Sequence, residues 1–149
     1  MKELEYPFDC ELILSRRRSL KKELLKEISE TGKKTLKKKI AVLGGSTTSD
    51  IRNCLELFLL NEGIEAEFYE SEYGRFWEDA MFGPPELVDF APDLIYIHTS
   101  NRNIRNYPEI ADQPQEVEEK LAAEYGKFEK MWERLAETYR CPIIQNNME

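Results

Sequence analysis

The segment Gly44-Gly45-Ser46-Thr47-Thr48 is the first place in this sequence where residue types and spacing allow chemistry. It joins a short apolar run to a helical pattern, so its backbone N–H groups can point at an anion or a developing oxyanion. Ser46 is then a candidate nucleophile, and Gly44, Gly45 and Thr47 are candidate anion-binding residues. Glycines and hydroxyl residues also make ordinary tight turns and helix caps, which is the competing interpretation. The segment is neither a Walker loop nor a complete GxGxxG fingerprint.

A hydroxyl nucleophile needs a general base, and His98 is the only histidine of the chain. It follows the apolar run 93–97, so it is placed at a strand end. A single histidine in that position is also often a hydrogen-bonded structural residue. Because no third orienting group can be identified, the sequence does not predict a complete catalytic triad.

The polar residues Asn101, Arg102 and Asn103 come soon after the same apolar run. Their amide and guanidinium groups donate hydrogen bonds without acid–base power, which suits oxyanion stabilisation or recognition of a phosphate or carboxylate. Asn101 is the candidate oxyanion donor, and Arg102 and Asn103 are candidate anion-binding residues. The alternative is an ordinary polar loop.

A second candidate ligand region contains Gly74 and Arg75 among the aromatic residues Tyr73, Phe76 and Trp77. These aromatic side chains either wall a ligand site or pack against the core. Arg75 is the charge within the group that best suits an anionic ligand.

Periodicity predicts the elements that would position these residues. Apolar runs typical of strands cover 39–43, 64–69, 93–97 and 142–145, and helical patterns cover 8–28, 49–62, part of 71–85, 86–90 and 115–139. The last helix carries a long apolar stripe made of Val117, Leu121, Tyr125, Phe128, Trp132, Leu135 and Tyr139. The alternation of strands and helices predicts an α/β fold, a three-layer parallel sheet preceded by an amphipathic helix. In a flavodoxin-like strand order the first and third strands are neighbours, which would bring Ser46 and Asn101 to one edge.

Composition limits the possible partners. The net charge of −8 is uneven, since residues 1–40 hold 12 Lys/Arg and 7 Asp/Glu, whereas the remainder holds 9 and 22. The acidic charge of residues 41–149 argues against a nucleic-acid partner. The basic residues of 1–40 fit either a solvated helical face that complements the acidic remainder or an acidic partner. No membrane-spanning or signal segment is found, so we expect a cytoplasmic protein. Three widely spaced cysteines predict neither a disulfide framework nor a zinc site, and no metal or cofactor is expected in this chain.

Three segments carry a resemblance to a known family. KKIAVLGGSTTSDI, EFYESEYGRFWEDA and PDLIYIHTSNRNI resemble the amino-terminal domain of FkbH-like proteins, and the similarity extends over nearly the whole chain. The resemblance implies a domain similar to SGNH hydrolases, followed in that family by a haloacid-dehalogenase-like phosphatase domain. It further implies a role in loading a glyceryl unit from a phosphorylated glycerate onto an acyl carrier protein.

The resemblance also assigns residues. Ser46 matches the first-block serine of SGNH hydrolases, Gly74 the second-block glycine and Asn101 the third-block asparagine. The Asp-x-x-His element has no counterpart, and His98 does not replace it by position. The phosphatase aspartate motif is also missing, so magnesium and phosphatase activity are expected only of a further domain.

Taken together, these observations predict a helical preface (1–36) and a partial SGNH-like α/β domain (37–149) that is incomplete at its C-terminus. The function they favour is that of a positioning domain for an acyl carrier protein or a phosphorylated acyl donor. A serine esterase or acyltransferase using Ser46, and a purely structural domain, are the alternatives. Because the sheet would end on an unpaired strand, we also expect self-association through the last strand.

Overall fold

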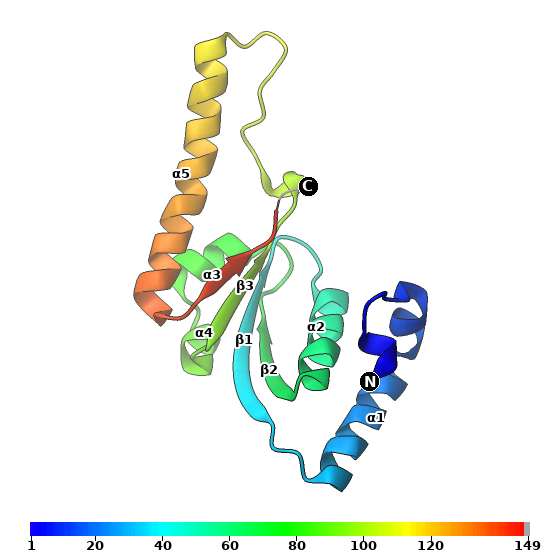
Figure 1. The fold of residues 1–149 in the computed structure, drawn as a ribbon. Helices are drawn as coiled ribbons and strands as arrows, with labels where there is room; N and C mark the ends of the chain where they lie inside the picture. Colours follow the sequence, from blue (N-terminus) through cyan, green and yellow to red (C-terminus); the bar gives the residue numbers. More distant parts are fainter. Residues whose placement is uncertain (148–149) are drawn as a thin grey trace.

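Four parallel strands form the centre of the structure, a computed structural model that describes residues 1–147 (Figure 1). They are β1 (Leu36–Gly44), β2 (Ile64–Glu70), β3 (Leu94–His98) and β4 (Ile143–Gln145), in the order β2-β1-β3-β4. The helices are α1 (Cys10–Thr31), α2 (Ser49–Asn61), α3 (Phe76–Phe82), α4 (Pro85–Phe90) and α5 (Pro114–Tyr139), with 3₁₀ turns η1 (Lys2–Leu4) and η2 (Asn101–Asn103). This arrangement confirms the predicted α/β class and its flavodoxin-like strand order.

The register of β1 explains why the loops of interest meet. β1 pairs in parallel with β3 from Ile40 opposite Leu94 to Gly44 opposite His98, so both strands end at the same level. On its other side β1 pairs with β2 from Leu36 onward. The apolar run had predicted a strand beginning only at residue 39. Backbone pairing extends it across lysines because ladder hydrogen bonds do not require apolar side chains.

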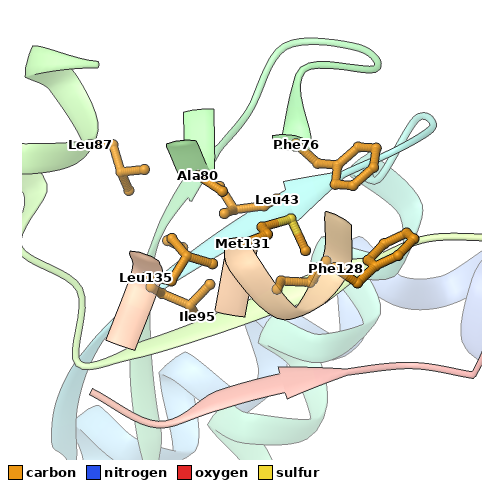
Figure 2. Packing of buried hydrophobic residues seen from close by; sticks show 10 residues of the cluster. Leu43, Phe76, Ala80, Leu87, Ile95, Phe128, Met131 and Leu135 are labelled. Atoms are coloured by element: carbon orange, nitrogen blue, oxygen red, sulfur yellow. The ribbon is translucent and has the colours of Figure 1, made fainter. Parts of the chain in front are cut away.

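The buried apolar residues form two clusters, one on a face of the sheet and one between α1 and α2. Leu43 and Ile95 belong to the cluster beneath α3, α4 and α5, which Figure 2 shows in close view. Its other buried members are Ala41, Phe76, Ala80, Leu87, Ile97, Phe128, Met131 and Leu135. Each large aliphatic side chain that is fully buried contributes about 1.5–3 kcal/mol relative to an exposed one. This cluster is therefore the main support for the sheet face below the candidate site.

The amphipathic first helix packs against α2 rather than standing apart. Asp9 caps α1 by accepting the Leu12 N–H at 2.9 Å, and the helix ends at Gly32 in the left-handed conformation. A second cluster forms between the two helices, made of Leu4, Ile13, Leu20, Leu24, Leu57 and Leu60. Lys21 pairs with Glu56 at 2.7 Å across the same contact. Basic residues of α1 thus complement acidic residues of α2.

Helix α5 is only half covered by the rest of the chain. Its second half buries Phe128, Met131 and Leu135, but Leu121 is 70% exposed and Tyr125 is 57% exposed. Figure 1 shows the first half of α5 rising beyond the sheet, next to the extended segment that precedes it. The sequence pattern indicated one continuous packed stripe, whereas the sheet is too short to cover it.

The described part of the chain contains no helix that combines the length and the apolar content needed to cross a membrane. The three cysteines are free thiols, with Cys10 exposed and Cys54 and Cys141 half-buried.

Candidate functional site

The glycine turn is tied to the ends of its neighbouring strands through its own backbone. The Gly45 N–H donates to the His98 carbonyl at 2.8 Å, and the Gly44 N–H donates to Ser71 Oγ at 2.8 Å. These two N–H groups are therefore engaged within the protein, and the expectation that they would face an anion needs correction. Within residues 1–147, the N–H groups of Ser46 and Thr47 have no hydrogen-bond partner.

Asn103 joins this turn to the loop that follows β3. Its Nδ2 donates to the Gly45 carbonyl at 3.0 Å, while its Oδ1 accepts the Ser100 N–H at 2.9 Å. The approach is close, because a Cβ atom at Gly45 would overlap the Asn103 amide. Asn101, which the resemblance singles out, is exposed and accepts at its carbonyl from the Tyr107 hydroxyl. The two loops meet as predicted from strand order, but the contact between them is made by Asn103.

The β3 loop is anchored from below by the end of the last strand. The Asn146 side chain accepts the Thr99 N–H and donates to the Thr99 carbonyl, both at 2.8 Å. Gln145 donates to the Thr99 hydroxyl at 3.0 Å and accepts from Trp132 Nε1 at 2.6 Å. Thr99 is buried at 1% exposure, so its partners fix the start of the loop.

His98 is at the predicted strand end, but its ring points away from α5. Ile95 and Ile97 face the cluster below α5, so Tyr96 and His98 face the opposite side of the sheet. The His98 Nδ1 accordingly lies 3.4 Å from the Tyr96 hydroxyl. Within the described residues the Ser46 hydroxyl makes no hydrogen bond, to His98 or to any other group. Ser46 and His98 therefore do not form a hydrogen-bonded nucleophile–base pair among residues 1–147.

A concave pocket of about 350 Å³ lies beside these loops. It is lined by Gly74, Phe76, Trp77, Glu78, Arg102, Asn103, Arg105 and Lys127. Three of these side chains are cationic and one is acidic. Among residues 1–147, Arg102 and Arg105 form no ion pair, whereas Lys127 lies 3.5 Å from Glu124. Two arginines that have no carboxylate partner among residues 1–147 therefore line one pocket.

Glu124 of α5 positions one of these arginines through its backbone. Glu124 is 5% exposed, and its carboxylate accepts the N–H groups of Arg105 at 3.1 Å and Asn106 at 3.4 Å. Burial alone would raise the pKa of this carboxyl group, but the Arg105 N–H and the Lys127 charge outweigh it, and the pKa is lowered. Glu124 therefore remains ionised and holds the segment of residues 104–106 against α5.

The sequence did not single out Arg105 or Lys127 as site residues. Arg105 follows the predicted polar cluster by two positions, so proximity was the only available signal. Lys127 comes from α5, far along the chain, and reaches the pocket only because α5 packs on the same sheet face as α3.

The predicted aromatic region is divided between the pocket and the core. Gly74 lines the pocket with a positive φ of 72°. Phe76 and Trp77 line it as well, while Phe76 also stacks on Phe128 in the core. Tyr73 is 77% exposed. Arg75 directs its guanidinium group to Glu72 and Asp79, at 3.5 and 3.7 Å, and does not line the pocket.

Comparison with known proteins gives one structural likeness. No protein-family model matches the chain, and no curated protein matches it. Its fold is similar to the crystal structure of the N-terminal part of the protein BF1531 from Bacteroides fragilis, described as containing a phosphatase domain complexed with Mg. The TM-score is 0.64 over 89% of this chain, with 20% sequence identity, and the match spans 32% of the other chain. The likeness shows a shared α/β fold. Separately, within residues 1–147 no cluster of three or more His, Cys, Asp or Glu side chains is arranged to hold a metal ion.

Proposed function

We propose that this domain binds a small anionic ligand, phosphorylated or carboxylated, in the pocket beside the β1 and β3 loops. The observation that carries the proposal is the placement of Arg102 and Arg105 on one pocket with no ion-pair partner among the described residues. Guanidinium groups bind carboxylates and phosphates in bidentate fashion, and such charge-assisted bonds are stronger than neutral ones. The pocket volume of about 350 Å³ lies within the range that small-molecule sites occupy.

The pocket suits binding better than chemistry. Ser46 and His98 do not line it, and its polar groups are cationic or amide donors apart from Glu78. Phe76 and Trp77 provide an apolar wall for the carbon part of a ligand. We therefore infer that the domain holds its ligand while reaction steps occur on another domain.

The resemblance to FkbH-like proteins narrows the small anionic ligand to a phosphorylated glycerate, whose glyceryl unit an acyl carrier protein would receive. Two findings support the narrower form. The pocket is cationic, and the structurally similar chain, of which the match spans 32%, is described as containing a phosphatase domain. The magnesium-dependent step would belong to such a domain and not to the residues of this pocket.

The binding proposal is tested by titrating the chain with inorganic phosphate, glycerate and 3-phosphoglycerate while recording amide NMR spectra. We expect shifts centred on residues 102–105 and 127. Arg102→Gln and Arg105→Gln should each weaken binding about ten-fold or more. Arg18→Gln, which removes an exposed arginine of α1 outside the pocket, is the matched control. Absence of shifts, or equal weakening by the control, would refute the proposal.

A serine esterase or acyltransferase is the second candidate, favoured by one observation: the Ser46 hydroxyl has no hydrogen-bond partner within the described residues and lies next to two N–H groups that are likewise without partners. A base is still needed, because the His98 ring faces Tyr96. Covalent labelling by a fluorophosphonate that disappears in Ser46→Ala would support this function. No labelling of the folded chain would end it.

A further inference from the structure

A second concave surface lies between α5 and the segment of residues 104–108. It has a volume of about 410 Å³ and shares no lining residue with the anion pocket. The lining residues are Ile104, Asn106, Tyr107, Pro108, Val117, Leu121, Glu124, Tyr125, Phe128 and Trp132. Since the Glu124 carboxylate is bonded to backbone N–H groups, the accessible surface of this groove is almost entirely apolar.

The groove has the dimensions of a helix-binding site. Its α5 wall runs from Val117 to Trp132, which corresponds to about 22 Å of helix. Leu121 and Tyr125 present apolar side chains that are 70% and 57% exposed. Amphipathic helices bind grooves of this kind through anchors spaced i, i+3, i+4 and i+7.

Charge distinguishes the two sides of this α5 wall. On the side nearer the anion pocket, Lys120 pairs with Asp112 and Lys127 with Glu124. The other side of the helix carries Glu118, Ala122, Tyr125 and Glu129, which are separated by four, three and four residues. All four are exposed. Neither glutamate forms an ion pair within residues 1–147. An occupant that covers Leu121 and Tyr125 therefore meets two free carboxylates and a small alanine that permits close approach.

We propose that this groove binds a basic amphipathic helix of a partner protein. Its apolar side covers Leu121 and Tyr125, and its lysines or arginines face Glu118 and Glu129. Opposite charges at the rim of an apolar contact steer association and fix orientation, while like charges exclude partners of the wrong sign. This interaction goes beyond the anion pocket, which uses different residues.

The test uses two labelled peptides of about 18 residues with identical leucines at helical spacing, one carrying lysines between them and the other glutamates. Fluorescence anisotropy with the full chain at physiological salt should show binding of the lysine peptide only. Leu121→Asp should weaken this binding at least ten-fold. Leu14→Asp is the matched control, since Leu14 is a 52% exposed leucine on α1.

The charge rule is tested separately from the apolar contact. Glu118→Lys combined with Glu129→Lys should abolish binding of the lysine peptide and permit binding of the glutamate peptide. Glu27→Lys combined with Glu67→Lys changes two exposed glutamates elsewhere by the same charge and should leave the preference intact. Failure of the lysine peptide to bind, or binding that Leu121→Asp leaves unchanged, overturns the proposal. So does a dimer of the chain that Leu121→Asp converts to a monomer, because the occupant would then be a second copy.

Discussion

The side chain of Asn103 bridges the loops after β1 and β3, donating to the Gly45 carbonyl at 3.0 Å and accepting from the Ser100 N–H at 2.9 Å. Asn103 also lines the cationic pocket, so this bridge links the glycine turn to that pocket. It depends on the missing side chain of Gly45, because any Cβ atom there would overlap the Asn103 amide.

Gly45→Ala should therefore destabilise the chain by about 1–3 kcal/mol through overpacking. Gly126→Ala is the control. An added Cβ at that α5 position meets nothing within 4 Å, and it should stabilise the helix by about 0.5–1 kcal/mol. Urea unfolding followed by circular dichroism measures both. In an Asn103→Ala background the cost of Gly45→Ala should fall, since the two side chains no longer compete for space. A Gly45→Ala variant as stable as the parent chain would contradict the bridge.

Glu124→Gln should destabilise the chain at neutral pH by about 1–3 kcal/mol, because the carboxylate accepts two backbone N–H groups in a buried position. Burial opposes ionisation, but the Arg105 N–H and Lys127 lower the folded-state pKa below the unfolded value. The ionised Glu124 carboxylate therefore contributes its full stabilisation above the pKa of about 4.3 that it has in the unfolded chain. That stabilisation is lost as the pH falls through the lower pKa of the folded chain. The difference between parent and variant should shrink between pH 6 and pH 3. Glu133→Gln, an exposed change on the same helix, should show no such dependence.

Asp79 should show the opposite dependence on pH. Burial raises its folded-state pKa, and the Tyr69 hydroxyl at 3.1 Å and the Arg75 charge only partly offset this. A raised folded pKa means that the stability contribution is full below the unfolded pKa of about 3.9 and is lost as the pH rises through the folded value. Asp79→Asn should thus gain stability relative to the parent chain between pH 4 and pH 7. Asp89→Asn, an exposed change on α4, provides the comparison. A parallel pH profile for parent and Asp79→Asn would refute this assignment.

Self-association through the last strand remains a prediction, and the fold identifies β4 as the edge strand that would pair. Within residues 1–147 the strand of residues 143–145 pairs with β3 and with no other strand, and Ile144 is 52% exposed. An unpaired, apolar edge strand is a template for pairing with another chain. Light scattering at increasing protein concentration should show dimers or larger species, and Ile144→Lys should reduce them. A clean monomer at high concentration would contradict the prediction.

Local patterns were sufficient for most elements. The alternation of apolar and acidic residues in 64–69 and the helical period in 115–139 were enough to predict β2 and α5, because these periods are present in the residues themselves. Ends were harder to predict, as the extension of β1 back to Leu36 shows, because strand pairing satisfies backbone groups whatever the side chain. The burial of Leu57 and Leu60 in α2 could not be read from the helical pattern over 49–62, because α1 covers them and the local pattern does not contain the position of α1.

The sequence by itself determined the α/β class, which follows from chain periodicity, and it predicted the meeting of the loops after β1 and β3 on the condition of a flavodoxin-like strand order, which the structure shows. Tertiary structure alone decided which side chains share a site. Asn103 rather than Asn101 contacts the glycine turn, the His98 ring lies on the face opposite α5, and Lys127 joins Arg102 and Arg105 from a distant helix. A side chain's neighbours depend on which face it occupies and on how the helices pack, and neither is encoded in the spacing of residues along one segment.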